Sequence, residues 1–367
     1  MKPMKWFLIA ISVALVALAI AQLTICAGDG ETDSPYTSDS LLAGNFRWVV
    51  TQPVLAINPE RLPPSPDNPW HAVKDPSIVR YRGRWHLFCS LRKQRGQNGL
   101  PPGYVRIGYM SFIDWKEASQ SQWHLLDLGM DYHGAPQVFY FTPQKKWFLV
   151  YQLEDRYKNI PYGPHYSTTD DIMDPTSWAP PKPFYSQKPS NMEGFFGLDY
   201  WVICDDEKAY LFFTTCDGRM WRAETGLKDF PNGFGRPEVV LHANIFEASH
   251  TYKLKGLNKY LTLIEAKGRS WGRVYRYYKA YISDALDGNW NELAASTKKP
   301  FAGEKNVEAI GPRWACNFGH GELLRTGYDE KFEADPQNLR FLFQGAGKSL
   351  NNPAYRLGLL EPARAIP

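Results

Sequence analysis

Three acidic residues stand where a short polar motif leads into an aromatic-rich run. Asp75 lies in VKDPSIV, Asp199 in GLDYWV and Glu247 in IFEAS, and each is followed by residues typical of a β-strand. A single acid before a strand is usually a turn cap or a solvated charge. The placement that the three acids share is more informative, because acids at equivalent positions of repeated units can converge on one pocket.

Converging carboxylates are suited to acid–base chemistry on a glycosidic bond. One carboxyl group protonates the departing oxygen, and a second activates the attacking water. A third negative charge nearby disfavours ionisation of the acid and keeps it protonated near neutral pH. Asp205 and Asp206 fall at a hairpin turn, where acids are ordinary, and Glu265 ends a second strand that we expect to lie away from the site.

The chain contains a repeat that would position such a trio. In five stretches a small or polar motif opens a β-rich run, a charged turn follows, and a second aromatic-rich strand returns. These stretches cover residues 74–90, 134–152, 197–215, 246–266 and 319–345. Their starts lie roughly 50 to 70 residues apart, the size of a four-stranded propeller blade with its loops. We therefore predict an all-β fold, a five-bladed β-propeller whose innermost strands line a central channel.

Two other architectures are alternatives to the propeller for an all-β or repeat-containing chain of this length. Long amphipathic helical periodicity is missing from the sequence, which argues against a TIM barrel. A β-sandwich with many hairpins remains the alternative.

Composition narrows the partners and the chemistry. Of the 367 residues 15% are aromatic, and such rings suit the flat faces of sugars or nucleobases. A net charge of +4 without a Lys/Arg run is too mild to argue for nucleic acid. No CxxC or His-x-His spacing appears, which argues against zinc. A disulfide remains open among Cys89, Cys204, Cys216 and Cys316.

The N-terminal segment predicts export. Residues 1–21 have a basic start, an apolar stretch from Trp6 to Ile20 and a small-residue cleavage site ending at Ala21, as a signal peptide does. The alternatives are a retained anchor, although the apolar stretch is short for a span of about 20 residues, and lipidation at Cys26. Residues 22–44 are predicted as a flexible linker and residues 45–367 as the propeller. The mature protein is expected to be secreted, without a stable membrane span.

Several motifs in one order resemble a known enzyme family. VKDPSIV, APQVFYF, LDYWVICDDEKAYLFFT, IFEASHTYKLKG, SDALDGNW and GHGELLR are together similar to glycoside hydrolase family 62, the α-L-arabinofuranosidases that act on arabinoxylan. The resemblance runs from about Phe46 to Leu360 and implies a five-bladed propeller that works by inversion. It implies that Asp75 is the general base, that Glu247 is the general acid, and that Asp199 raises the pKa of the acid and orients it.

The same resemblance implies further site residues. Roles in sugar binding are implied for Lys74, Gln137, Arg276 and Tyr355. Lys279 stands where a second arginine is expected, which leaves the role of Arg276 open. His320 in GHGELLR resembles a histidine beside a calcium ion in the channel. Because calcium prefers oxygen ligands, water would have to complete its shell.

Two classes of function follow. The first is an exported, monomeric, inverting α-L-arabinofuranosidase that acts on arabinoxylan or arabinoxylo-oligosaccharides without an organic cofactor. The second is a non-catalytic, lectin-like propeller. Among enzymes, the nearest alternative is a family 43-like β-xylosidase or arabinanase. An acid on each of three blades favours an enzyme, because a binding module does not need it.

Overall fold

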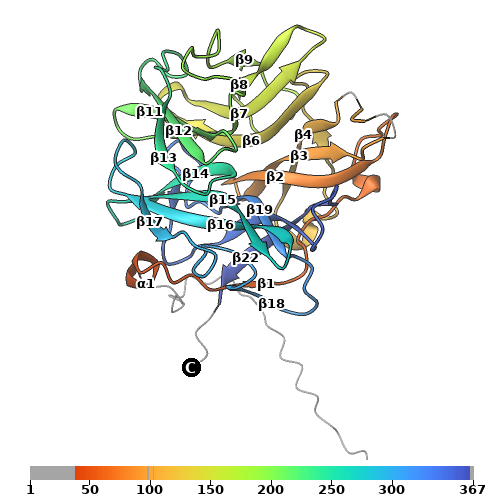
Figure 1. Cartoon of the computed structure of the whole chain (residues 1–367). Coiled ribbons are helices and arrows are strands. Elements are labelled where there is room, and N and C mark those ends of the chain that lie inside the picture. The colour runs from red at the N-terminus through yellow and green to blue at the C-terminus, as the bar shows by residue number, and fades with distance from the viewer. Residues whose placement is uncertain (1–37, 97–98, 102, 364–367) are drawn as a thin grey trace, which may run out of the picture. The chain divides into compact units, whose positions relative to one another are not determined.

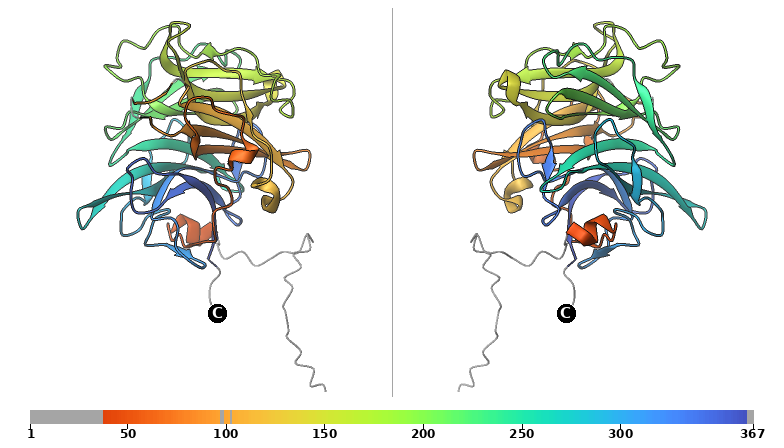
Figure 2. Two further views of the ribbon diagram at one scale, coloured as in Figure 1. Left: turned by 90° about the vertical axis from the view of Figure 1, so that its right-hand side faces the viewer. Right: turned by 90° about the vertical axis from the view of Figure 1, so that its left-hand side faces the viewer.

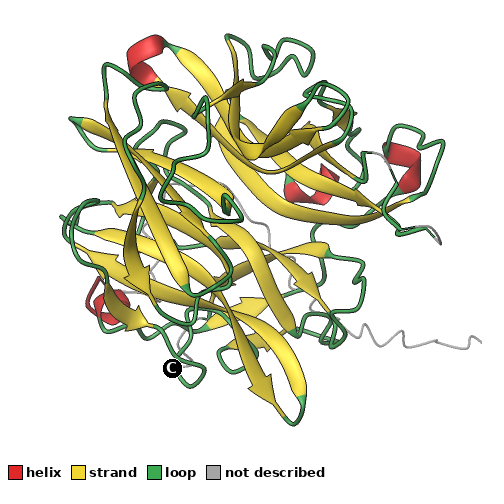
Figure 3. Cartoon of the chain, turned by 45° about the horizontal axis from the view of Figure 1, so that its top comes forward, coloured by secondary structure: helices red, strands yellow, loops and turns green. Residues whose placement is uncertain are grey.

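Strands make up nearly all of the regular structure (Figure 3). The computed structural model describes residues 38–96, 99–101 and 103–363. Its helices are short: α1 (Ser38–Leu42), α2 (Trp115–Ala118) and the 3₁₀ helices η1 (Pro59–Arg61) and η2 (Thr142–Gln144). Within these residues no helix has the length and apolar character needed to cross a membrane. The predicted all-β class is confirmed.

Five sheets form the blades of a propeller (Figure 1). Blade 1 contains β2 (Trp70–Tyr81), β3 (Arg84–Lys93), β4 (Val105–Phe112) and β5 (His124–Leu125). Blade 2 contains β6 (Tyr132–Phe141), β7 (Lys146–Asp155), β8 (Ile160–Thr169) and β9 (Lys182–Pro183). Blade 3 contains β10 (Leu198–Cys204), β11 (Lys208–Thr214), β12 (Arg219–Gly226) and β13 (Glu238–His242).

The last two blades are five-stranded. Blade 4 contains β14 (Glu247–Leu254), β15 (Tyr260–Ser270), β16 (Arg273–Ser283) and β17 (Asn291–Ala294), with β20 (Glu333–Ala334) beside β14. Blade 5 contains β19 (Asn317–Leu323), β21 (Phe341–Ala346), β22 (Arg356–Pro362), β1 (Trp48–Val50) and β18 (Val307–Ala309). Each of the five predicted strand pairs is the inner pair of one blade, and in the fifth pair β20 interrupts the connection and joins blade 4 instead.

Aromatic residues pack the blades against one another. Trp201 of β10 lies 5.5 Å from the Tyr252 ring of β14, and its indole N–H donates to the Thr251 carbonyl at 2.9 Å. Because each sheet has blades on both sides, strands such as β7 are buried on both faces. The buried tryptophans are Trp48, Trp85, Trp123, Trp147, Trp178, Trp201, Trp221, Trp290 and Trp314. Much of the aromatic content therefore serves blade packing rather than sugar binding.

The two ends of the described chain close the ring in blade 5 (Figures 1 and 2). Strand β1 pairs in parallel with β18, where Trp48 lies opposite Val307, and antiparallel with β22, where Val50 lies opposite Leu360. Leu41 of α1 is fully buried in the same apolar cluster as Trp48. The predicted linker boundary at residue 44 is therefore wrong, because residues 38–44 contribute a helix and a core side chain.

Other predictions about the ends of the chain stay untested. The predicted signal peptide, Cys26 and the remaining linker residues up to 37 lie outside the described residues. The four cysteines in the described part, Cys89, Cys204, Cys216 and Cys316, are all free.

Candidate active site

A β-bulge near the start of each inner strand builds the site. The register with the second strand shifts between Lys74 and Ser77 in β2, and at corresponding positions in β6, β10, β14 and β19. The bulge residue has a left-handed backbone in four blades, with φ of 49° at Asp75, 49° at Ala135, 54° at Asp199 and 60° at Ala248. Such a bulge re-aims side chains, and it is common next to active sites. In β19 the corresponding residue is His320.

Side chains of the preceding blade hold these bulges in place. The backbone N–H of Asp75 donates to Gln344 Oε1 at 3.0 Å, and that of Asp199 donates to Gln152 Oε1 at 3.1 Å. In the same way the Ala135 N–H donates to Ser90 Oγ at 2.8 Å. Since left-handed backbone is costly for residues other than glycine, these bonds between blades fix a geometry that the strand alone would not keep.

The three predicted acids meet in one pocket. Its lining residues are Lys74, Asp75, Tyr104, Tyr132, Gln152, Glu154, Tyr162, Phe195, Leu198, Asp199 and Glu247. The three acids are not strictly equivalent, however: Asp75 and Asp199 are bulge residues, whereas Glu247 stands one position earlier and corresponds to Lys74. The bulge residue of β14 is Ala248, whose N–H donates to Asp199 Oδ2 at 2.9 Å.

Asp75 lies between two cationic groups. Lys74 Nζ is 3.4 Å from its carboxylate, and His320 Nδ1 is 3.7 Å from Oδ1. Burial raises the pKa of Asp75, whereas the positive charges of Lys74 and His320 lower it. The net result is a pKa below the usual value. Asp75, which is only 7% exposed, is therefore ionised at neutral pH. These properties suit a group that accepts a proton from water.

Glu247 has the opposite environment. Burial, followed by the negative charge of Glu265, raises the pKa of Glu247 to about 8, although the Arg276 guanidinium opposes the shift. Arg276 Nη1 lies 3.2 Å from Glu247 Oε2 and 2.8 Å from Glu265 Oε1. Glu247 thus keeps its proton at neutral pH, as a proton donor must.

His320 connects Asp75 and Asp199. Its Nδ1 lies 3.3 Å from Asp199 Oδ2, and its ring packs edge-on against His250 at 4.5 Å. Burial lowers the pKa of His320, but Asp199 and Asp75 raise it to about 9. His320 is therefore a cation that links Asp75 and Asp199.

The predicted calcium ion beside His320 stays a prediction. The described part of the chain contains no group of three or more His, Cys, Asp or Glu side chains arranged to hold a metal. No step of the proposed chemistry passes through calcium, and metal analysis of the purified protein would test whether the ion is present.

The predicted sugar-binding residues lie in different places. Lys74 lines the pocket. Arg276 lies beside it, bonded to Glu247 and Glu265. Tyr355 is 4% exposed. The centre of the Tyr355 ring lies 5.9 Å from Lys74 Nζ.

Gln137 does not reach the pocket. Its Nε2 donates to the Val202 carbonyl at 2.7 Å, its Oε1 accepts from the Val202 N–H at 2.8 Å, and its exposure is 1%. The amide links blade 2 to blade 3. The prediction that Gln137 binds sugar is therefore corrected: it is a structural residue.

Glu265 is the functional residue that the sequence placed wrongly. It was expected away from the channel because it ends a second strand. Strand β15 continues to Ser270, however, and Glu265 pairs with Glu247, the first residue of β14. Its side chain is fully buried, and its Oε2 accepts a hydrogen bond from the backbone N–H of His320 at 2.7 Å. Asp205, in contrast, lies at the predicted turn, where it accepts the N–H groups of Glu207 and Lys208.

A row of aromatic rings forms one wall of the pocket. Ring centres lie 5.5 Å apart between Tyr104 and Tyr132, 6.1 Å between Tyr132 and Tyr162, and 5.3 Å between Tyr162 and Phe195. Tyr132 also accepts a hydrogen bond from Gln152 Nε2. The sequence did not single out these rings, because they come from strand ends and loops of blades 1 to 3.

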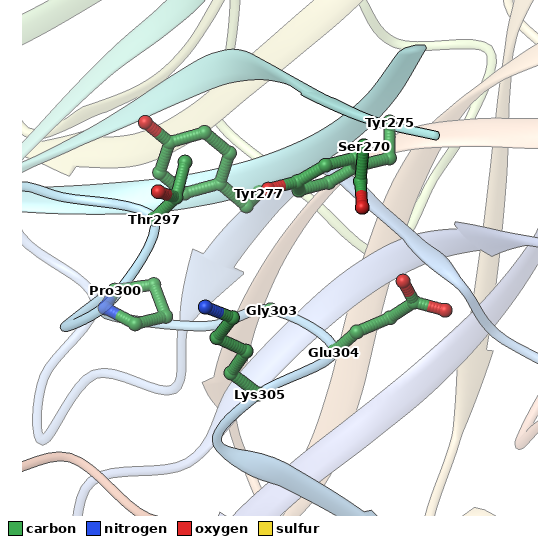
Figure 4. Close-up of a pocket in the computed structure, with 8 residues that line it drawn as sticks. All are labelled: Ser270, Tyr275, Tyr277, Thr297, Pro300, Gly303, Glu304 and Lys305. Atoms are coloured by element: carbon green, nitrogen blue, oxygen red, sulfur yellow. The ribbon is translucent and has the colours of Figure 1, made fainter. Parts of the chain in front are cut away.

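A second hollow lies on blade 4, between the β15–β16 hairpin and the loop that leads to β18 (Figure 4). It is lined by Ser270, Tyr275, Tyr277, Thr297, Pro300, Gly303, Glu304 and Lys305. The single carboxylate in its lining, Glu304, is paired with Arg273. It therefore lacks the two acids that glycosidic hydrolysis needs, and the pocket with Asp75 and Glu247 is the candidate active site.

Comparisons with known proteins point to one family. The model of the family described as Glycosyl hydrolase family 62 matches residues 61–361. A curated relative, Alpha-L-arabinofuranosidase C of Cellvibrio japonicus (strain Ueda107), is 37% identical over 332 residues. That match covers 87% of this chain and 48% of the relative, so that the chain spans about half the length of the curated protein it matches.

Solved structures agree with the family match. The catalytic domain of the Coprinopsis cinerea GH62 α-L-arabinofuranosidase is 36% identical, with a TM-score of 0.76 over 88% of this chain and 99% of that chain. An α-L-arabinofuranosidase from Podospora anserina, solved in complex with cellotriose, is 33% identical, with a TM-score of 0.75 over 87% of this chain and 98% of that chain. A GH62 hydrolase solved in complex with xylotriose is 34% identical, with a TM-score of 0.74 over 86% and 97%.

Proposed function

Since the chain belongs to glycoside hydrolase family 62, we propose that it is an inverting α-L-arabinofuranosidase that releases terminal arabinofuranosyl side chains from arabinoxylan. Asp75 is the general base, Glu247 is the general acid, and Asp199 positions the acid. The match of the family model confirms the family that the motifs predict. The reaction, its stereochemistry and the roles of the three acids are proposed.

One observation carries the proposal: two acids of one pocket have pKa values displaced in opposite directions. Cationic neighbours lower the pKa of Asp75, whereas burial and Glu265 raise that of Glu247 to about 8. Over a broad pH range the first is ionised while the second is protonated. Inversion requires this pair of states, because base and acid act in the same step.

The proposed step balances as follows. Asp75 takes a proton from a water molecule as its oxygen attacks the anomeric carbon, on the face opposite the leaving group. Glu247 gives its proton to the glycosidic oxygen as the bond to the xylose unit breaks. Asp199, which accepts the N–H of Ala248, holds the backbone next to Glu247. Lys74, which lines the pocket, is assigned a hydrogen bond to a furanose hydroxyl in this proposal.

The substrate class follows from the pocket and its rim. We propose that one arabinofuranose occupies the pocket against the aromatic wall, and that the xylan backbone crosses the rim. Phe195 is 44% exposed there, and Gly163, Pro164 and His165 line an adjoining hollow that shares Phe195 with the pocket. Trp271, at the tip of the β15–β16 hairpin, is fully exposed and is the other aromatic candidate. The xylotriose and cellotriose complexes of related structures support a β-linked backbone as the ligand class.

Export and the monomeric state are part of the proposal. Residues 1–21 have the composition of a signal peptide. N-terminal sequencing of exported protein should find a chain that begins near Gln22, whereas an intact Met1 or a lipid on Cys26 would contradict this. Gel filtration with light scattering should give the mass of one chain.

Product identification tests the proposed activity. The protein is incubated separately with wheat arabinoxylan, debranched arabinan and xylo-oligosaccharides. We expect free arabinose from arabinoxylan alone. Xylose from xylo-oligosaccharides or arabino-oligosaccharides from arabinan would contradict the substrate class, and binding to arabinoxylan without any product would favour the lectin-like alternative.

A further inference from the structure

Glu265 occupies a position that recurs in every blade. In each blade, the last residue of the inner strand that is paired before the bulge faces a polar residue of the second strand. These polar residues are Ser90, Gln152, Thr214, Glu265 and Gln344. Ser90, Gln152 and Gln344 accept the bulge N–H of the next blade, and Glu265 does the same for His320. Three neutral side chains perform this task, so that the task itself does not require a charge.

A charge at this position is costly. Glu265 is 0% exposed, and a buried carboxylate loses its hydration, a cost that a cation and hydrogen bonds must offset. The compensating cation is Arg276, whose Nη1 donates to Glu265 Oε1 at 2.8 Å. The same nitrogen donates to Glu247 Oε2 at 3.2 Å, so that one guanidinium nitrogen bridges two carboxyl groups on neighbouring strands.

The bridge creates an electrostatic problem at the acid. An arginine that contacts one carboxyl group favours its ionised form, and an ionised Glu247 has no proton to give. A second carboxylate on the same guanidinium offsets that cation. It also places a negative charge next to Glu247, which favours the protonated form. The two effects on the pKa of Glu247 are opposite: Glu265 raises the pKa and Arg276 lowers it.

We propose that Glu265 is a positioning residue: as the counter-charge of Arg276, it lets the guanidinium orient Glu247 without removing the proton that Glu247 donates. This proposal rests on the proposed function, in which Glu247 is the general acid. It adds a second buried carboxylate to the tuning assigned to Asp199, and it acts through Arg276 rather than on the sugar.

Several charged or titratable groups face Glu247 and remain in place when Glu265 is changed. They are Lys74 of β2, Asp199 of β10, Cys216 of the β11–β12 turn, Arg276 of β16 and Tyr355 before β22. Of the negative charges that raise the pKa of Glu247, Glu265 has the largest effect. Its removal should therefore be seen above the background of the others.

The test is the pH dependence of kcat/KM for Glu265→Gln. Glutamine fills the same position in two other blades and keeps an acceptor for His320. In this variant the basic limb on arabinoxylan should move to lower pH by about one unit or more, because loss of the negative charge lowers the pKa of Glu247. Activity should recover as the pH is lowered. On an aryl arabinofuranoside, whose leaving group needs no protonation, the loss above neutral pH should be much smaller.

Two further variants separate charge from structure. Glu265→Asp keeps the charge and should keep a basic limb near that of the wild type, even if its shorter side chain lowers kcat. Glu304→Gln is the matched control, because it also removes a glutamate that pairs with an arginine of β16, Arg273, outside the pocket. Its pH profile should coincide with that of the wild type.

Each other outcome counts against the proposal. A Glu265→Gln profile with an unmoved basic limb, or an equal loss at all pH values and on both substrates, would show a structural role. So would a Gln variant that does not fold while the Asp variant does. A wild-type protein that releases no arabinose from arabinoxylan would refute the proposed function instead, so that the two failures are distinguishable.

Discussion

Removal of the Glu247 carboxyl group should affect substrates according to their leaving groups. The environment of Glu247 raises its pKa from the usual 4.5 to about 8. At pH 6 that shift takes the protonated fraction from about 3% to about 99%. A xylose hydroxyl is a poor leaving group, so that its departure depends on this proton, and general acid catalysis is typically worth about 10²–10⁴-fold. We expect Glu247→Ala to lose about that factor in kcat on arabinoxylan, or roughly 3–5 kcal/mol of barrier.

The assay compares two substrates and two variants. On 4-nitrophenyl α-L-arabinofuranoside, whose phenolate leaves without protonation, Glu247→Ala should lose less than about tenfold, since little of the 10²–10⁴-fold acid assistance is needed there. Asp75→Ala should be inactive on both substrates, because water must be activated whatever group departs. Initial rates at pH 6, with thermal unfolding to confirm folding, give the four values required.

Two results would refute this reasoning. An equal loss on both substrates for Glu247→Ala would mean that Glu247 does more than protonate the leaving oxygen. An Asp75→Ala variant that keeps activity on the aryl substrate would mean that Asp75 is not the base.

Three other changes test separate parts of the account. Asp199→Asn keeps an acceptor for the Ala248 N–H and should move the basic limb of the pH profile to lower pH. The shift should be smaller than for Glu265→Gln, because the Asp199 charge has the smaller effect on the pKa of Glu247. An unmoved limb would contradict the tuning role of Asp199. Gln137→Leu should lower the free energy of unfolding by about 1–3 kcal/mol, because it leaves both Val202 backbone groups without their partner, with KM unchanged; a raised KM at unchanged stability would restore the sugar-binding role. Leu41→Ala should cost about 2–5 kcal/mol in urea unfolding, as expected for a core leucine, whereas an unchanged midpoint would restore the linker boundary at residue 44.

The five hairpins were predictable because local residues determine them. Aromatic and β-branched runs interrupted by charged turns favour hairpins, and their regular spacing predicts blades. The closure of blade 5 was not predictable in this way. Strand β1 has three residues, and its pairing with β18 and β22 depends on partners more than 250 residues away in sequence.

The site was predicted in outline, and the error at Gln137 has a specific cause. The sequence does not reveal the bulge, so that residues near the start of each first strand look equivalent. Gln137 stands two residues after the bulge residue Ala135, and corresponds to Ser77 rather than to Asp75. Its side chain therefore meets the next blade.

A signal for Glu265 was nevertheless present in the sequence. Four of the five hairpins carry a neutral polar residue where the second strand returns to the channel: Ser90, Gln152, Thr214 and Gln344. Glu265 is the charged member of that set. Alignment of the hairpin ends as well as their starts would have placed it opposite Glu247. Such an alignment would not have revealed the contact between Glu265 and Arg276, because that contact depends on how β16 lies against β15.

The stereochemistry of the product tests the central claim most directly, since the claim is that Asp75 and Glu247 act together on one bond. Proton NMR spectra, recorded within the first minutes of arabinoxylan hydrolysis, identify the anomer of arabinose that forms before mutarotation. With Asp75 activating water on the face opposite the leaving group, β-arabinofuranose should appear first, and the two carboxyl groups should stand roughly 6.5–9.5 Å apart in a substrate complex. If α-arabinofuranose appears first, the reaction passes through a covalent intermediate, and the roles assigned to Asp75 and Glu247 are wrong.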